Sequence, residues 1–319
     1  MNVEVTEDAI KAEISKCRMF IDFMLKQQQW SGINREDIDR WISNFAGISE
    51  SEKLLAYKLL SNLIYYSEKD VIEALKEGIY NCLLKKTILE KQILSDFTLS
   101  SQALLQIEKD ELKKTCFIPL LDSNAPHESG NYVSRLLVQQ GMINSDHSIF
   151  LNNIEETFNT IGFSRLVIID DCVGSGDQLR DFWNINAEVK FNGKNTLLKN
   201  YCRAKKIDVN YLTLFGYEPS IERLKSELAE LNICCVRGLN DLQRVFVEGS
   251  YVWENEVERK IAIKFFERLT RDVMIPFYGY KGLDFAFIMH RTIPDWSLPI
   301  FWKEKDDWQL LLRRKNSNA

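Results

Sequence analysis

With 319 residues, of which 45% are hydrophobic and 27% charged, the chain is long enough for a sizeable core and for two domains. Its formal net charge of −5 gives no general attraction to nucleic acid or to anionic membranes, so direct nucleic-acid binding is not expected. The sequence shows no signal peptide and no apolar run long enough to cross a bilayer, which predicts a cytoplasmic protein.

The cysteines and histidines argue against two further kinds of site. The seven cysteines are odd in number and lack C-x-x-C spacing, which fits a reducing cytosol better than a disulfide framework. The adjacent Cys234 and Cys235 suit a buried strand better than a metal site. His127, His147 and His290 are widely separated, so a histidine-based metal centre is not expected.

The first third of the chain is predicted to be helical. Ser49 with Glu52, and Ser67 with Asp70, have the spacing of capping boxes, which places helix starts there. No proline precedes Pro119, so an all-α domain is expected over residues 1–113. The apolar faces of the predicted helices are formed by Ile10, Ile14, Cys17, Ile21 and Met24; by Leu55, Leu59, Leu60, Leu63 and Ile64; and by Val71, Leu75, Ile79 and Leu83.

From Thr115 onward, short apolar runs alternate with helical patterns. Such alternation predicts a parallel sheet with right-handed crossovers, so residues 114–319 are expected to form an α/β domain. The predicted strands are Cys116–Leu121, Leu166–Ile169, Val209–Phe215, Ile233–Val236 and Phe285–Met289. The predicted helices are Tyr132–Gln140, Leu151–Ile161, Asp177–Trp183, the polar segment Asn195–Lys206, an amphipathic helix from Pro219 to about Leu231, and Glu254–Val273.

The most informative segment is R-L-V-I-I-D-D-C-V-G-S-G-D-Q-L at residues 165–179. Its apolar run indicates a buried strand, and Asp170 and Asp171 follow at the carboxyl end, where open α/β sheets bind their ligands. The turn Gly174-Ser175-Gly176 then opens a predicted helix, and backbone N–H groups at such a turn suit a phosphate. Two carboxylates suit a ribose diol or a magnesium ion. The segment therefore predicts a site for a phosphorylated sugar.

This segment has three other possible interpretations. A dinucleotide-binding fingerprint would need glycine at Leu179 and an acid about twenty residues later. The acidic strand of a P-loop ATPase would need G-x-x-x-x-G-K-[ST], which the chain lacks. A buried strand followed by an acid-capped turn stays open as a purely structural alternative. Adjacent carboxylates repel each other, however, which favours a cation or a donor-rich ligand.

The segment resembles the phosphoribosyl-pyrophosphate-binding motif of type I phosphoribosyltransferases, in which four apolar residues and two acids precede a turn such as A-T-G-G-T. The resemblance implies that Asp170 and Asp171 hold the ribose hydroxyls, directly or through Mg²⁺, and that residues 174–178 hold the 5′-phosphate. Asp177 and Gln178 stand where the family prefers Gly and Thr. These departures bring a negative charge close to the phosphate and remove a hydroxyl, so glycosyl cleavage of a nucleotide is an alternative to synthesis.

Three blocks in order resemble a divergent group of phosphoribosyltransferase-like proteins of bacterial conflict and antiphage-defence systems. They are F-I-P-L-L-D with E-S-G-N, the segment above, and H-R-T-I-P-D-W-S-L-P-I-F-W. The resemblance implies a phosphoribosyltransferase-like domain after a helical region. It also implies that the loop Asp122–Gly130 binds pyrophosphate, chiefly through Ser129 and Gly130, although its turn-forming residues equally suit a surface loop. The ending that contains Pro294 and Pro299 would be a lid over the site or an edge strand.

These inferences predict an effector or regulator in antiphage defence that acts on or binds a phosphorylated ribose, either phosphoribosyl pyrophosphate or a nucleotide, with Mg²⁺. Asp170 and Asp171 would be both the catalytic and the metal-binding residues. The alternative is a non-catalytic module that senses a nucleotide or phosphosugar and docks a partner protein such as a defence ATPase. The sequence contains no unambiguous general acid or base that would decide between them.

Overall fold

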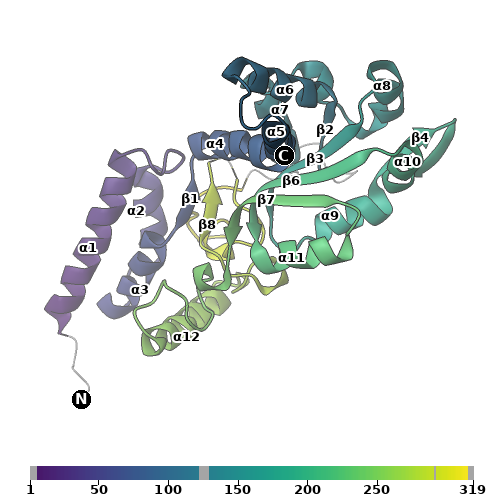
Figure 1. The fold of residues 1–319 in the computed structure, drawn as a ribbon. Helices are drawn as coiled ribbons and strands as arrows, with labels where there is room; N and C mark the ends of the chain where they lie inside the picture. Colours follow the sequence, from purple (N-terminus) through teal and green to yellow (C-terminus); the bar gives the residue numbers. More distant parts are fainter. Residues whose placement is uncertain (1–5, 122–128, 291, 315–319) are drawn as a thin grey trace. The chain divides into compact units, whose positions relative to one another are not determined.

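The computed structural model describes residues 6–121, 129–290 and 292–314 (Figure 1). The described residues divide into two compact units, one formed by residues 6–70 with 240–314 and the other by Val71–Leu239. The predicted mixed α/β class, with a parallel sheet and a helical N-terminal region, is confirmed. The predicted boundary at residue 113 falls inside the second unit. No helix in the described part of the chain is long and apolar enough to cross a membrane.

The first unit begins with three helices, α1 (Glu7–Lys26), α2 (Arg35–Ser43) and α3 (Glu50–Ser61). The predicted capping box at Ser49 is present, since its side chain accepts from the Glu52 N–H and the Glu52 carboxylate accepts from the Ser49 N–H. A long helix, α12 (Glu256–Asp272), packs against α3. The aromatic centre of this core contains Trp41, Phe45, Phe265, Phe266 and Phe301.

The first unit also contains a two-stranded parallel sheet that was not predicted. Strand β1 (Ile64–Tyr66) pairs with β8 (Phe287–Met289), with Ile64 opposite Phe287. The helical assignment of Ile64 was therefore wrong, and β8 is not a strand of the four-stranded sheet. The C-terminal segment continues into this core through η7 (Pro299–Phe301), and the Trp41 indole donates to the Ile300 carbonyl at 3.0 Å.

The second unit is built on a four-stranded parallel sheet in the order β2–β3–β6–β7. In the register, Ile168 lies between Ile118 and Tyr211. The four strands predicted for this region are confirmed, with longer extents for three of them. They are β2 (Thr115–Pro119), β3 (Arg165–Val173), β6 (Asp208–Tyr217) and β7 (Asn232–Leu239).

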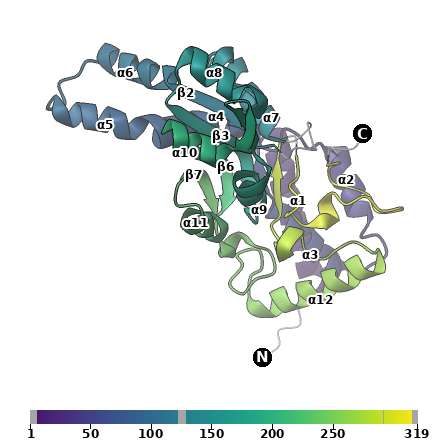
Figure 2. The ribbon, with the colours of Figure 1, turned by 90° about the vertical axis from the view of Figure 1, so that its right-hand side faces the viewer.

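Helices cover both faces of this sheet. One face packs on α8 (Ile154–Ile161), α9 (Asp177–Asp181), η4 (Phe182–Asn186), α10 (Leu198–Lys205) and α11 (Glu218–Glu227). The other face meets α4 (Glu68–Gly78), where a Cβ on Gly78 would lie 2.9 Å from the Leu212 side chain. The π-helix η1 (Ile79–Leu84) then leads into α5 (Lys85–Leu94) and α6 (Ser101–Lys113), which form a helical hairpin (Figure 2).

A β-hairpin replaces part of the helix predicted for residues 195–206. Strands β4 (Glu188–Phe191) and β5 (Lys194–Leu197) pair antiparallel, and only the later residues form α10. The two turn residues, Asn192 and Gly193, both have positive φ, at 51° and 76°. Asn-Gly is the strongest short-range hairpin signal, and the overall polarity of the segment concealed it.

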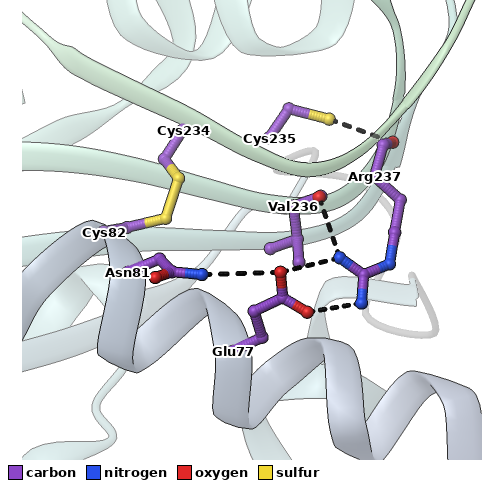
Figure 3. The surroundings of a disulfide bond; sticks show 7 residues. All are labelled: Glu77, Asn81, Cys82, Cys234, Cys235, Val236 and Arg237. Atoms are coloured by element: carbon purple, nitrogen blue, oxygen red, sulfur yellow. Dashed lines mark hydrogen bonds and ion pairs between the residues drawn. A yellow bond between two sulfur atoms is a disulfide. The ribbon is translucent and has the colours of Figure 1, made fainter.

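One disulfide joins η1 to β7, against the expectation that the cysteines stay unpaired. Cys82 and Cys234 are bonded across a sequence separation of 152 residues (Figure 3). Beside them Glu77 of α4 forms an ion pair with Arg237 of β7, with one N–O distance of 2.8 Å. Among the described residues, the other five cysteines form no disulfide. The predicted strand position of Cys234 and Cys235 is confirmed.

Candidate functional site

Strand β3 carries the acid pair within the four-stranded sheet. It lies between β2 and β6, and Leu166–Ile169 are fully buried, as the apolar run predicted. The strand extends to Val173, so Asp170 and Asp171 belong to its last part rather than to the loop after it. Both acids therefore lie toward the carboxyl edge of a parallel sheet, the edge at which such sheets bind ligands.

Asp170 is buried and both of its carboxylate oxygens accept hydrogen bonds. Oδ1 accepts from the Asp171 N–H at 2.9 Å, and Oδ2 accepts from the Tyr211 hydroxyl of β6 at 3.0 Å. Burial and the charge of Asp171 raise the pKa of Asp170 well above its ordinary value, and the Tyr211 hydrogen bond opposes the rise. Burial and Asp170 also raise the pKa of Tyr211. Tyr211 therefore keeps its proton and orients Asp170.

Asp171 is buried like its neighbour but lies on the other face of the strand. Successive side chains of a strand point to opposite faces, so Asp170 shares a face with Ile168 and Tyr211, whereas Asp171 does not. The Asp171 Oδ1 accepts from the Cys172 N–H at 2.7 Å. The pair thus consists of one carboxylate held by Tyr211 and a second carboxylate directed to the opposite face.

Asp170→Asn is expected to stabilise the protein at neutral pH. A carboxyl whose pKa is raised by folding favours the native state only while it is protonated, so its ionisation costs stability as the pH rises above the unfolded value of about 4. Asparagine can still accept from the Asp171 N–H. Melting curves of both proteins should coincide near pH 4, and the variant should melt at least about 2 °C higher at pH 7–8. Equal destabilisation at every pH would contradict this expectation.

The predicted phosphate turn is stabilised by packing from α11. Gly176 has φ +77°, and a Cβ there would lie 2.7 Å from the Leu224 Cδ1. The Ser175 Oγ accepts from the Asp177 N–H at 3.3 Å, and the Ser175 carbonyl accepts from the Arg223 guanidinium. The turn therefore needs glycine at position 176 both for its backbone conformation and for its close contact with α11.

The acidic residue after the turn forms an ion pair with a neighbouring arginine. Asp177 pairs with Arg180 one helical turn later, at 2.8 Å. Arg180 also pairs with Asp181 at 3.3 Å. The charge of Asp177, and to a smaller extent that of Asp181, raises the pKa of Arg180. Gln178, the other departure from the family turn, is exposed. The charge at Asp177 is thus partly offset, which reduces its repulsion of a bound phosphate.

The predicted pyrophosphate loop lies mostly outside the described residues, which resume at residue 129. Ser129 and Gly130 form the first turn of α7 (Ser129–Gln139) rather than the end of a loop, and the side chain of Ser129 is outside the description. A Cβ on Gly130 would lie 2.5 Å from the Leu120 carbonyl oxygen. Because the Leu120 N–H donates to the Ile169 carbonyl, Gly130 reaches the sheet edge that also carries the acid pair.

Magnesium is the cofactor that the family resemblance implies, and carboxylate oxygens are donors that suit it, although Asp170 and Asp171 lie on opposite faces of β3. Mg²⁺ is usually held by one or two carboxylates together with waters and ligand phosphates. A bound cation would also offset the repulsion by Asp171 that raises the pKa of Asp170. Among the described residues, no group of three or more His, Cys, Asp or Glu side chains could hold a metal. A Mg²⁺ ion held by these carboxylates would need further ligands such as waters and ligand phosphates.

Two residues of the site were missed from the sequence. Tyr211 was assigned to a buried strand without a role. A buried tyrosine hydroxyl needs a polar partner, and this requirement is the signal that could have indicated a contact with a neighbouring strand. Arg223 was placed in an amphipathic helix with no signal that it would contact the turn. The order of β3 and β6 in the sheet brings both residues to the motif.

The four-stranded parallel sheet with helices on both faces is consistent with a phosphoribosyltransferase-like fold. Residues 38–314 match the model of the PRTase-CE family, so the chain belongs to this family. The match begins in α2 and includes residues of both compact units, whereas the sequence placed the phosphoribosyltransferase-like domain after the helical region, over residues 114–319. No curated protein and no solved structure matches the chain.

Proposed function

We propose that the protein binds a phosphorylated ribose, either phosphoribosyl pyrophosphate or a nucleotide, together with Mg²⁺. It then transfers the phosphoribosyl group or cleaves the glycosidic bond at the anomeric carbon. In this proposal it is an effector or regulator in antiphage defence. The observation that carries the proposal is the continuity of β3, which presents two buried carboxylates directly before a glycine turn. Family membership supports the phosphoribosyltransferase-like part of the proposal. The defence role rests on the sequence resemblance alone.

Each group has a distinct task in this proposal. Asp171 and Asp170 accept hydrogen bonds from the ribose diol and hold Mg²⁺, which would supply positive charge to the phosphates. Residues 174–178 hold the 5′-phosphate, and the first turn of α7, with Ser129 and Gly130, holds the departing pyrophosphate or its counterpart. The carboxylates favour the positive charge that develops on the sugar when the glycosidic bond breaks. Catalysis would then depend on orientation and electrostatics.

Phosphoribosyl pyrophosphate, ribose 5-phosphate or a nucleoside monophosphate is expected to raise the melting temperature only in the presence of Mg²⁺. A ligand at about 100 times its Kd stabilises the native state by about 2.7 kcal/mol, which scanning fluorimetry detects readily. Unphosphorylated ribose is the matched control and should have no effect. The absence of a shift with any phosphorylated ribose at millimolar concentration would contradict the proposed function.

A binding module without catalysis is the second candidate function. It is favoured by exposed apolar side chains on α1, namely Met19, Phe20 and Phe23, because apolar groups gathered on a surface are typical of protein contacts. This candidate would keep the ligand site as a sensor and dock a partner protein. Mass spectrometry of a nucleotide extract incubated with the protein and Mg²⁺ separates the two, since only the enzyme changes its ligand.

A further inference from the structure

Helix α11 lies directly against the proposed phosphate turn, although it follows a different strand. Leu224 of α11 is buried, and its side chain fills the space where a Cβ on Gly176 would lie. The preceding residue, Arg223, is therefore held beside Ser175, and its guanidinium donates to the Ser175 carbonyl. Two independent contacts thus bring a cation to the turn from a region outside the motif.

The Arg223 guanidinium has the capacity for a further ligand. It carries five N–H donors in one plane, and the hydrogen bond to the Ser175 carbonyl does not use all of them. The other described partner is Glu227, whose Oε1 lies 3.7 Å from the Arg223 Nε, beyond the usual range of a hydrogen bond. The side chain is 49% exposed, so an incoming anion can reach it.

The charges around the turn make Arg223 the cation most suited to an anion. Arg180 is engaged by Asp177 at 2.8 Å and by Asp181 at 3.3 Å, so its charge is already balanced. A bound phosphate would be repelled by the negative end of the Ser175 carbonyl dipole, and a guanidinium that donates to this carbonyl offsets that repulsion. Arginine also matches phosphate geometry through paired N–H donors.

We infer that Arg223 is the residue that recognises the 5′-phosphomonoester, which it binds while donating to the Ser175 carbonyl. This inference rests on the proposed function and deepens it by naming what selects a phosphorylated over an unphosphorylated ribose. Arg223 gives the turn the positive charge that its own residues lack, and it compensates for the glutamine at position 178. The site is accordingly specific for a terminal phosphate dianion on the sugar.

The test compares the binding of ribose 5-phosphate with Mg²⁺ by wild type, Arg223→Gln, Arg223→Lys and the control Lys225→Gln. Lys225 is on the same helix and pairs with Glu222, so its loss removes the same charge without touching the turn. We expect Arg223→Gln to weaken binding about 10- to 100-fold, Arg223→Lys to weaken it less, and Lys225→Gln to leave it within about twofold. Near-UV circular dichroism and melting temperature establish that each variant is folded.

The pH dependence distinguishes phosphate recognition from a purely structural role. A phosphomonoester gains its second charge near pH 6, so wild-type affinity should rise between pH 5 and 7.5, and Arg223→Gln should flatten that rise. Weaker binding with an unchanged pH profile would mean that Arg223 only holds the turn, and would overturn the inference. Equal binding by wild type and Arg223→Gln would overturn it while leaving the proposed function intact. No binding by wild type would overturn both.

Discussion

Replacement of both Asp170 and Asp171 by Asn is expected to leave a folded protein that no longer binds a phosphorylated ribose. Asparagine keeps the size of the side chains and much of their hydrogen bonding, but it removes the charge that would hold Mg²⁺ and accept from the ribose diol. We expect the loss of affinity to be at least about 100-fold, because each carboxylate contributes charge-assisted hydrogen bonds of about 1.5–3 kcal/mol. Calorimetric titration with phosphoribosyl pyrophosphate and Mg²⁺ measures it.

The two single variants divide this effect between the acids. Asp171→Asn should lose most of the binding with little change in melting temperature. Asp170→Asn should lose less binding and should gain stability at neutral pH, because it removes a buried charge next to another carboxylate. A gain in stability with a loss of binding is typical of a residue retained for function rather than for folding.

The same double variant also tests the defence role in cells. If the site carries the function, protection against phage or any toxicity of the protein should disappear while the protein still accumulates. Asp208→Asn offers a control, because Asp208 is the first residue of β6 and lies at the edge of the sheet away from the acid pair. Its partners are Arg165, Asn210 and Asn232. Full protection by a stable double variant would remove the acid pair from the function.

The sheet and its motif were predictable because their signals are local. The apolar run before Asp170 is rich in β-branched residues, which predicts a buried strand, and the glycine turn follows within a few residues. Pro219 and the apolar spacing after it likewise located α11. The parallel arrangement of the strands, though not their order, followed from the alternation of strands and helices.

Features that depend on distant parts of the chain were not predictable. Ile64 has helical spacing from its predecessors, but it forms a strand because its partner, Phe287, lies far along the chain. The Cys82–Cys234 disulfide joins residues that are 152 positions apart, so the spacing of the cysteines does not indicate that these two pair. Arg223 reaches the turn only because β6 is the neighbour of β3. Local pattern thus identified the acids and the turn, whereas the tertiary fold determined which side chains surround them.

Gly176→Ala is expected to produce the largest loss of stability of any conservative substitution in the motif. Alanine at a φ of +77° costs about 1–2 kcal/mol in backbone strain. Its Cβ would also lie 2.7 Å from the Leu224 Cδ1 in a buried contact. Such overpacking costs about a further 1–3 kcal/mol. We expect a total of about 2–5 kcal/mol by denaturant unfolding, with phosphosugar binding lost as the turn moves.

Gly162→Ala is the matched control, because it separates the strain from the clash. Gly162 has φ +81° at the end of α8, and apart from its chain neighbours no atom of the described residues lies within 4 Å of the Cβ position. Its substitution should therefore cost only the backbone term of about 1–2 kcal/mol and should leave ligand binding unchanged. Adding Leu224→Ala to Gly176→Ala should recover part of the loss, since it removes the opposing methyl groups, and the double-mutant cycle should give a favourable coupling energy. If both variants lost the same free energy of unfolding and both still bound ligand, the packing of α11 against the turn would not shape the site. The position assigned to Arg223 beside the phosphate would then lose its structural basis.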